Sequence, residues 1–487
     1  MGLGRAAADP LYRDAIDSPS STSNIVWFRR DLRLTDNPAW VRAVLAARPI
    51  CALFVLDPVL VATAGELRRR LLLAHLSELD TTLAELGGRL RGESGDPASI
   101  VPRLALELGA EHVFLNADTT PYARRRDAAV ARKIPGRVEA TWGTLVQPPG
   151  AVLTRAGAVS HVFTPFWKTW EQVAWEPWPS LRSEDDGAVT VLDEPGAGLP
   201  APRGDPPEAP GERGALERLA IFDAHADDYL DERDIPSVAG TSSLSADLRF
   251  GTISPRHIAT RIGTSTRGRA GFVRQLAWRD WYAHLIDELP HLRTRAMRPD
   301  TAAIEWIDDD EQFEAWSHGL TGYPIIDAGM RELIATGRMH NRVRMLCASF
   351  LVKDLLIDWR RGERWFRTML IDADVSQNVG NWQWVAGAGP DAAPFFRVFN
   401  PTMQSRKFDA DGAYIRRWVP ELRGLDASQI HDPSTVGTLE LAGAGVMIGT
   451  DYPPPIVDHD RARHRALAVY GAARDRSREQ VTPPEPR

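Results

Sequence analysis

The sequence has 487 residues, of which 43% are hydrophobic and 25% are charged, and its formal net charge is -7 at pH 7. A chain of this length exceeds what one hydrophobic core usually supports, so we expect two or three globular domains. The acidic balance excludes a uniformly basic nucleic-acid binder, although local basic clusters can still form a nucleic-acid surface.

The two cysteines, Cys51 and Cys347, lie far apart and each falls within an apolar run. This usage excludes a disulfide scaffold and a cysteine-rich metal site, and it is typical of a reducing compartment. The polar N-terminal segment lacks the apolar core of a signal peptide, and no stretch reaches transmembrane length. We therefore predict a cytoplasmic protein with no metal ligands and no membrane association, in which residues 1–22 form a disordered tail.

The first domain is predicted from strand and helix patterns in alternation. Short β-branched and aromatic runs predict strands at NIVWF (24–28), ICALFVL (50–56) and EHVFL (111–115). Helical patterns lie between them at ELRRRLLLAHLSELDTTLAEL (66–86) and PASIVPRLALELG (97–109). The alternation predicts a parallel, Rossmann-like α/β sheet over residues 23–150. Neither G-x-G-x-x-G nor a P-loop lysine follows the first strand, so the usual phosphate loops are not expected.

A composition change divides the chain after this domain. Residues 183–214 are rich in proline, glycine and acidic side chains, so we place an interdomain linker at 151–214. Beyond it, Leu, Ile, Met and Trp recur at helical spacing, which predicts a mainly α-helical domain over 215–475. The last residues, RSREQVTPPEPR (476–487), predict a second disordered tail.

Hydroxyl side chains gather in GTSSLS (240–245), where one helical segment ends and another begins. Backbone N–H groups and hydroxyls at a helix start can bind an anion, so this segment could hold a phosphate or pyrophosphate. Taken alone, an ordinary helix cap and turn explains the segment at least as well.

The segment MHNRVRMLCASFLVKDLLIDW (339–359) has the apolar period of a single helix. One stripe carries Asn341, Arg344, Met345, Ala348, Val352, Leu355 and Trp359. Such a helix rises roughly 27 Å from the first of these residues to the last. An arginine within the stripe needs a carboxylate partner, and Asp372 or Asp374 is the candidate. A structural ion pair is the alternative to a ligand-binding one.

Carboxylates, amides and indoles are concentrated in DADVSQNVGNWQW (372–384), where a plain core would use Leu and Val. This composition predicts a ligand-binding segment. The runs RGERWFR (361–367) and QSRKF (404–408), with Arg342 and Arg397, place positive charge beside aromatic rings. That combination favours a nucleic-acid backbone with stacking platforms, and a solvated basic face is the alternative.

These motifs, together with VWFRRDLRLTDNPAW, WRDWYAHLI, TGYPIIDAGMREL and FFRVFNPTMQSRKFD, occur in one order over nearly the whole chain. The sequence thereby resembles the photolyase/cryptochrome family of flavoproteins, and most of all the class I photolyases for cyclobutane pyrimidine dimers. The resemblance implies an N-terminal antenna domain, a helical FAD domain and a monomer.

The resemblance also implies a set of FAD-binding residues. Arg344 would pair with Asp372 beside the flavin, and Asn378 would face flavin N5. The implied cofactor residues are Tyr229, Thr241, Ser242, Ser243, Leu244, Ser245, Phe272, Arg344, Asp372, Asp374 and Asn378.

The implied reaction is light-driven repair of UV-damaged DNA by electron transfer from excited, reduced FAD to a flipped pyrimidine dimer. Trp382, Trp359 and Trp306 would carry electrons between the flavin and the surface, and Asn378 belongs to the same electron-transfer set. Residues implied to contact the lesion or its strand are Arg233, Gln275, Trp278, Arg279, Asn341, Arg342, Met345, Trp384 and Gln404.

The sub-family rests on three positions. Enzymes for (6-4) photoproducts carry histidines where this chain has Asn341 and Met345, which favours cyclobutane dimers as substrate. Gln275 stands where cyclobutane photolyases usually carry a glutamate, and an amide cannot offer a proton or a counter charge. A cryptochrome-type blue-light photoreceptor with weak or no repair is therefore the alternative function.

Three short segments bear on a second, antenna chromophore: GDP (95–97), NADTTPYARRRD (116–127) and DLRFG (247–251). They resemble family members that use a deazaflavin more than those that use a folate. Asp118 and Arg249 occupy the matching positions, whereas Thr120 stands where a carboxylate is often found.

Overall fold

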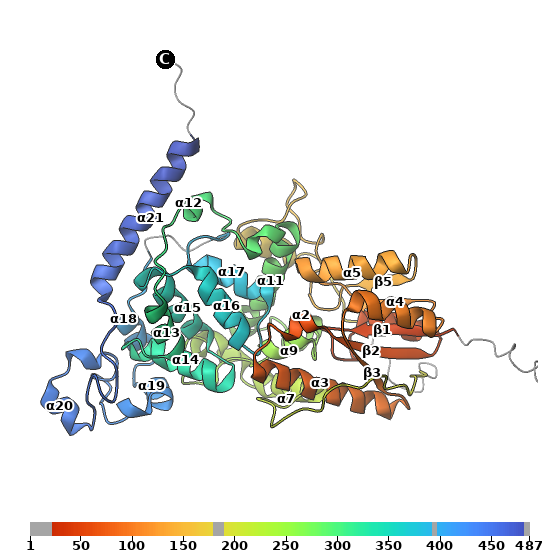
Figure 1. The fold of residues 1–487 in the computed structure, drawn as a ribbon, viewed down its shortest axis with the longest axis horizontal. Helices are drawn as coiled ribbons and strands as arrows, with labels where there is room; N and C mark the ends of the chain where they lie inside the picture. The colour runs from red at the N-terminus through yellow and green to blue at the C-terminus, as the bar shows by residue number, and fades with distance from the viewer. Residues whose placement is uncertain (1–21, 179–188, 392–396, 482–487) are drawn as a thin grey trace, which may run out of the picture.

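The computed structural model describes residues 22–178, 189–391 and 397–481 (Figure 1). The predicted N-terminal tail therefore lies outside the described residues except for Thr22, and residues 482–487 of the predicted C-terminal tail lie outside them as well.

The N-terminal domain contains a parallel five-stranded sheet of order β3-β2-β1-β4-β5, with the first strand at its centre. The strands are β1 (Asn24–Phe28), β2 (Ile50–Leu56), β3 (Leu90–Ser94), β4 (Val113–Asn116) and β5 (Val138–Thr141). The connecting helices are α1 (Pro38–Leu45), α2 (Pro58–Val61), α3 (Glu66–Glu85), α4 (Pro97–Glu107) and α5 (Pro121–Lys133). The predicted α/β class and its three predicted strands are confirmed; β3 and β5 escaped prediction because LRGES and VEAT have little apolar character.

Both faces of this sheet are covered, as a continuous apolar strand requires. Val26 and Phe28 of β1 belong to one hydrophobic core, while Ile25 and Trp27 belong to another. Because successive side chains of a strand point to opposite faces, these two cores lie on either side of the sheet. Figure 1 shows helices above and below the strands accordingly.

The predicted linker is not a featureless connection. It contains α6 (Phe163–Trp170), whose Phe163, Phe166 and Trp170 are buried in a core of the helical domain. Their spacing forms one apolar stripe along the helix, and that stripe has to be buried. The next helix, α7 (Gly211–Asp223), begins inside the range assigned to the linker, so the boundary at residue 214 was placed too late.

The rest of the chain is helical, which confirms the predicted class of the second domain. Its α-helices before the C-terminal one are α8 (Tyr229–Glu232), α9 (Ser245–Phe250), α10 (Pro255–Ile262), α11 (Arg267–Glu288), α12 (Pro299–Ala302), α13 (Asp310–His318), α14 (Pro324–Thr336), α15 (Asn341–Ser349), α16 (Trp359–Met369), α17 (Val375–Val385), α18 (Pro401–Phe408), α19 (Ala413–Trp418) and α20 (Thr438–Gly443).

The single helix predicted for 339–359 is wrong. Helix α15 ends at Ser349, a π-helical turn η5 (Phe350–Asp354) follows, and Leu356 adopts the left-handed φ of 57°. Asp358 then caps α16 by accepting the Arg360 N–H at 2.9 Å. Leu355, Leu356 and Ile357 at the break are buried and apolar, so the hydrophobic period of the sequence continues although the helix does not. Trp359 therefore does not share a helix face with Arg344.

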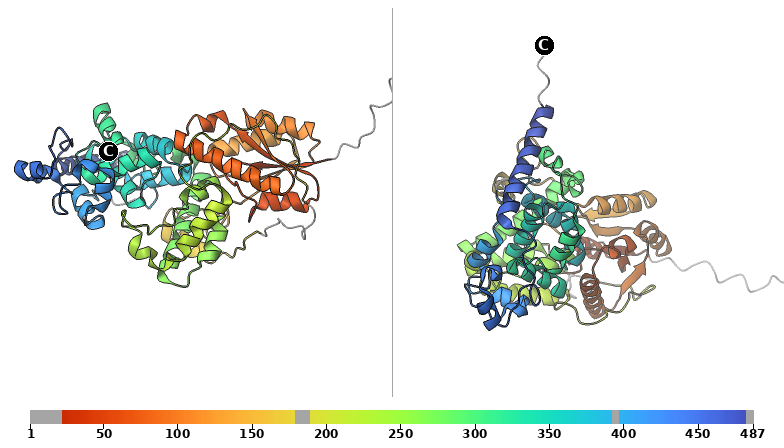
Figure 2. Two further views of the ribbon diagram at one scale, coloured as in Figure 1. Left: turned by 90° about the horizontal axis from the view of Figure 1, so that it is seen from below. Right: turned by 60° about the vertical axis from the view of Figure 1, so that its left-hand side comes forward.

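The C-terminal helix α21 (His459–Val481) packs against α12 and η5, and its end extends away from the body of the protein (Figures 1 and 2). The tail predicted from residue 476 is wrong as far as Val481, because Arg, Glu and Gln there favour continuation of a helix already formed. Over the described ranges, every helix is too short or too polar to cross a membrane.

Candidate functional site

A pocket lies where α15, α16 and α17 meet, and it brings together seven predicted site residues: Asn341, Arg344, Met345, Asp372, Asp374, Asn378 and Trp382. Its other lining residues are Ala348, Phe366, Leu370, Ala373, Gln377, Asn381 and Val385. The segment predicted to bind a ligand thus contributes one wall. Asp374 starts that wall as the N-cap of α17, accepting the N–H groups of Ser376 at 2.9 Å and Gln377 at 3.1 Å.

The expected ion pair is present, because Arg344 Nη2 lies 2.8 Å from Asp372 Oδ2. Burial by itself would raise the pKa of Asp372, but Arg344, Ser245 and Arg338 together lower it. The other carboxylate oxygen, Oδ1, is buried without a hydrogen-bond partner among the described residues. An ionised carboxylate with an unused acceptor in a pocket wall calls for a donor from a ligand.

Ser245 is the link between this pocket and the predicted phosphate segment. It begins the short helix α9 and lies close enough to Asp372 to lower the pKa of that carboxyl group, and Ser243 just before it has a left-handed φ of 53°. Leu244, Tyr229 and Phe272 are buried in one core, with the rings of Tyr229 and Phe272 packed edge-on at 5.3 Å. The aromatic and hydroxyl residues predicted for FAD therefore lie on adjoining elements.

Asn378 is held by Glu363 of α16. Its side-chain nitrogen donates to the backbone carbonyl and to Oε1 of Glu363, each at 2.9 Å. These bonds use both N–H groups, which leaves the amide oxygen as the free acceptor. Burial raises the pKa of Glu363, while Arg367 and Asn378 oppose the rise. Sequence analysis missed Glu363 because it stands in a run, RGERWFR, that was assigned to a basic surface.

Two of the predicted relay tryptophans, Trp382 and Trp359, are buried in the same core, and Trp306 is half-buried at its edge. A Cβ on Gly362 would meet the ring of Trp382 at 2.1 Å, so glycine lets this indole approach α16 within a turn of Trp359. Trp306 in turn packs edge-on against Tyr470 of α21. Trp316, fully buried and 6.3 Å from Trp382 between ring centroids, was not predicted.

The residues predicted to contact the lesion lie in different environments. Trp278 of α11 stacks on Phe163 with ring centroids 3.7 Å apart. Gln275 donates to the Gly271 carbonyl of its own helix at 3.1 Å. Arg279 is turned inward, donating to the carbonyls of Thr144 and Leu248, so the structure engages it between domains and not at a surface for DNA.

A basic and aromatic patch does lie beside the pocket. The guanidinium of Arg342 lies 4.4 Å from the ring centroid of Phe408, and Lys407 lies 5.0 Å from it. Arg342 is anchored by Asp234 at 2.8 Å, and the neighbouring Arg233 lies over Tyr229. Gln404 is half-buried on α18, the helix of Phe408. Arg361, from the run RGERWFR, pairs with the exposed Asp308 and Asp310, as Arg342 pairs with Asp234.

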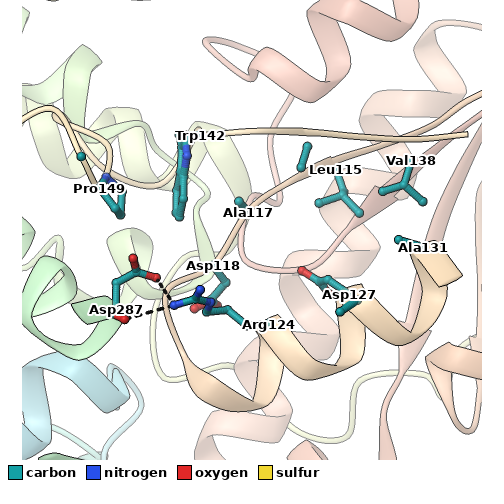
Figure 3. A pocket seen from close by; sticks show the side chains of 13 residues that line it. Leu115, Ala117, Asp118, Arg124, Asp127, Ala131, Val138, Trp142, Pro149 and Asp287 are labelled. Carbon is teal, nitrogen blue, oxygen red and sulfur yellow. Dashed lines mark hydrogen bonds and ion pairs between the residues drawn. The ribbon is translucent and has the colours of Figure 1, made fainter. Parts of the chain in front are cut away.

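A second cavity, of about 660 Å³, lies between the β4–β5 edge, α5 and the loop at Trp142 (Figure 3). Asp118 lines it, whereas Arg249 does not. Arg124 of α5 and Asp287 of α11 form an ion pair of 2.9 Å in its wall. Arg249 instead donates to the Ala373 carbonyl beside the first pocket, so the two residues predicted for the antenna do not line one cavity.

Within the part of the chain that the structure describes, no three His, Cys, Asp or Glu side chains form a group that could hold a metal ion. The first pocket instead fits a flavin by its donors and acceptors. Asp372 Oδ1 offers an orphaned buried acceptor, Asn378 a fixed amide oxygen and Trp382 a buried aromatic edge.

Fold and pocket together define a two-domain flavin-binding protein. Residues 24–183 match the family model for DNA photolyase, and residues 272–472 match the FAD binding domain of DNA photolyase. The chain belongs to the DNA photolyase family.

Relatives cover almost the full length. Deoxyribodipyrimidine photo-lyases of Agrobacterium fabrum and Escherichia coli are 39% and 40% identical, covering 92% and 93% of this chain and 98% and 99% of their own. A class III photolyase structure from Agrobacterium tumefaciens superposes with a TM-score of 0.86 at 38% identity, covering 96% of this chain and all of its own. A Synechocystis cryptochrome gives 0.84 at 29% identity, covering 92% and 99%.

An archaeal photolyase structure from Sulfolobus tokodaii, described as holding two FAD molecules with the implication of a novel light-harvesting cofactor, gives a TM-score of 0.80 at 33% identity. The match covers 93% of this chain and 100% of that one. The resemblance found in the motifs is thus confirmed at the level of the family, while the assignment to class I stays a prediction.

Proposed function

We propose that this protein is a deoxyribodipyrimidine photo-lyase that splits cyclobutane pyrimidine dimers in UV-damaged DNA with light. The observation that carries the proposal is one shared pocket. Asn341 and Met345, the residues expected at the lesion, line the same cavity as Asp372 and Asn378, the residues expected at the flavin. The flavin as electron donor and the lesion as electron acceptor would therefore lie next to each other, and electron transfer is efficient only over a short distance.

Bound FAD, once reduced, supplies the electron when it absorbs light. The protein's own part is to hold the cofactor in place and to exclude water. Arg344 and Asp372 form a fixed ion pair at one side of the pocket, and the amide of Asn378 is held by Glu363. Preorganised groups of this kind stabilise a chosen charge state without rearranging. The buried indoles of Trp382 and Trp359 keep water from that side and are the proposed relay toward Trp306.

The DNA partner is proposed from the patch beside the pocket. Photolyases are a known example of enzymes that extrude their target bases from the duplex, so the lesion has to enter the pocket. Arg342 and Lys407, both close to the ring of Phe408, would contact the strand, combining phosphate neutralisation with an aromatic platform. Trp278 and Trp384 remain the proposed contacts to the flipped dimer.

The lesion class is proposed from the side chains at the pocket mouth. Asn341 and Met345 cannot act as the acid and base that the histidines of (6-4) enzymes provide, and the Asn341 amide points to Met345 Sδ at 3.9 Å. Amide and thioether suit a lesion that needs hydrogen bonding and apolar contact but no proton transfer. Cyclobutane dimers fit that description.

A blue-light photoreceptor is the second candidate. Two observations favour it: the similarity to the Synechocystis cryptochrome, and Gln275, whose amide already donates within its own helix. The features that oppose it are the Asn341 and Met345 pair and the basic patch at Phe408, which a signalling protein has no need to keep.

A second chromophore is also proposed, a deazaflavin in preference to a folate, with Asp118 as its ligand. In support, Asp118 lines a cavity of about 660 Å³ whose walls combine the Trp142 indole and small apolar side chains with the charged Arg124, Asp127 and Asp287. A flat ring packs well against such walls, with a carboxylate to accept its N–H groups. We further propose that the protein acts as a monomer in the cytoplasm.

Binding to DNA separates the two functions. Purified protein is titrated in the dark with a duplex that carries one cyclobutane thymine dimer and with the same duplex undamaged, while fluorescence anisotropy is followed. A repair enzyme is expected to prefer the damaged duplex by at least about a hundredfold. Equal affinity for both duplexes would remove the physical basis of repair and favour the photoreceptor.

A further inference from the structure

Arg30 of the α/β domain lies between the pocket at α15, α16 and α17 and the second cavity, and it contacts one lining residue of each. Arg30, in the loop after β1, contacts the Asp118 carboxylate at 3.1 Å and the Asp374 carboxylate through its other terminal nitrogen. Its Nε donates to the Arg249 carbonyl at 3.3 Å. Asp118 lines the cavity of the α/β domain, and Asp374 lines the flavin pocket. A single guanidinium therefore connects both.

Asp374 is more than a charged neighbour, because it starts α17. Its Oδ1 accepts the N–H groups of Ser376 and Gln377, and its carbonyl accepts the Asn378 N–H at 2.8 Å. The other oxygen, Oδ2, is the one that Arg30 holds. The first turn of α17 is thus fixed from two sides, by its own cap and by a residue of the other domain.

Helix α17 carries three residues of the proposed reaction: Asn378, Trp382 and Trp384. A small shift at its start would be passed to the Asn378 amide one turn later, since a helix moves largely as a rigid unit. Burial by itself would raise the pKa of Asp374, but Arg30, Arg279 and Arg249 together lower it. Arg30 therefore both holds the carboxylate and, with Arg279 and Arg249, keeps it ionised.

We infer that Arg30 is a positioning residue, which fixes the start of α17 through Asp374 and is itself fixed by Asp118 in the wall of the second cavity. Arg30 itself lines neither cavity and acts through the two carboxylates that do. A ligand that takes the hydrogen bonds of Asp118 changes how Arg30 is held, so the second cavity and the flavin pocket are coupled. The part that concerns the flavin rests on the proposed function.

The chain offers a matched control in the preceding residue. Arg29 lies in the same loop and pairs with Asp127 at 2.6 Å, inside the α/β domain and away from α17. Arg29→Gln and Arg30→Gln remove the same charge from the same loop. A general loss of stability affects both variants, whereas a loss of positioning affects α17 in only one.

The test is amide hydrogen exchange of the full-length protein, followed by mass spectrometry on peptides that cover 372–384. Arg30→Gln is expected to speed exchange in the first turn of α17 by about tenfold, because the start of the helix opens locally, and Arg29→Gln is expected to leave it at the wild-type rate. Arg30→Lys should fall between, since one ammonium cannot serve both carboxylates as the fork does. Equal exchange in the two glutamine variants would overturn the inference.

FAD affinity and a replacement variant complete the test. The dissociation constant for FAD, titrated into apo-protein, is expected to rise about tenfold in Arg30→Gln and to stay unchanged in Arg29→Gln. If even the wild-type protein binds no FAD, the proposed function fails, while the exchange rates still decide about Arg30. Should Arg30→Gln not fold, Asp118→Asn takes its place: about threefold faster exchange in α17 would support the inference, and an unchanged rate would overturn it.

Discussion

The side-chain nitrogen of Asn378 donates to the carboxylate and to the backbone carbonyl of Glu363, each at 2.9 Å. Asn378 lies on α17 and Glu363 on α16, so this pair joins the two helices that form one side of the proposed flavin pocket. Because Glu363 accepts both N–H groups of the Asn378 amide, the amide oxygen is the atom that remains available to the pocket. The orientation of Asn378 is therefore built by a second residue that itself does not line the cavity.

Replacing Glu363 with alanine should destabilise the protein. The side-chain bond of a buried amide is lost, and an unmet donor of this kind costs about 1–3 kcal/mol. Urea unfolding measures the loss. Arg367→Ala is the control, because Arg367 contacts Glu363 only at 3.6 Å and is partly exposed. A loss in the control as large as in Glu363→Ala would show that charge, and not the amide, determines the effect.

Trp382→Phe should slow the photoreduction of bound FAD at least about tenfold, because phenylalanine is much harder to oxidise than tryptophan. Repair by chemically reduced protein should be spared, since that reaction needs no outside electron. Absorbance at flavin wavelengths under blue light gives the first rate, and dimer repair the second. Trp316→Phe, in the same core, is the control. Loss of both reactions in Trp382→Phe would contradict a relay role.

Gln275→Glu should raise the yield of repair, because a carboxyl group can offer a proton or a counter charge that an amide cannot. Repair per absorbed photon, measured with reduced protein at saturating damaged DNA, provides the comparison. Gln275→Ala serves as the second variant and should lie below the wild type if the amide donates to the lesion. A yield in Gln275→Glu equal to that of the wild type would show that the amide suffices.

Acid should weaken the protein through His75 of α3. Its ring is fully buried, and Nδ1 accepts the Gly211 N–H at 2.9 Å at the start of α7. Burial, with the charge of Arg218, lowers the pKa of His75 to about 3. The unfolded chain takes up this proton near pH 6.5 and the folded one does not. Stability is therefore complete above about pH 6.5 and is lost progressively down to about pH 3.

The expected loss from His75 between pH 7.5 and pH 5 is about 2 kcal/mol, from a proton that only the unfolded state binds over most of this range. Urea midpoints at the two values measure it. In His75→Asn, which retains an acceptor for Gly211 but does not titrate, the difference should shrink by that amount. An equal difference in both proteins would contradict the assignment.

What could be predicted from the sequence was whatever depends on local pattern. The buried strands β1 and β2 are continuous apolar runs, and the partner of Arg344 had to be a nearby carboxylate. The break after η5 could not be predicted, because Leu355, Leu356 and Ile357 are buried as the interior of a helix would be. The spacing of apolar residues indicates which positions are buried, but it does not indicate whether the backbone continues as one helix.

The contacts that position the site were beyond prediction for a different reason. Arg30 and Asp374 are 344 positions apart, and no local pattern pairs them. The same holds for Phe163, which stacks on Trp278 from within the range assigned to the linker. Arg279 was assigned to DNA by its position in a motif, yet its guanidinium is engaged by carbonyls of two other segments. Only the fold supplies such information.

Light-dependent repair tests the central claim most directly. Chemically reduced protein is mixed with an oligonucleotide that carries one cyclobutane thymine dimer, and the recovery of thymine absorbance is followed under blue light and in the dark. We predict recovery in the light and none in the dark. Absence of recovery in the light, with FAD bound and photoreducible, would contradict the claim and leave the photoreceptor, or another lesion, as the function.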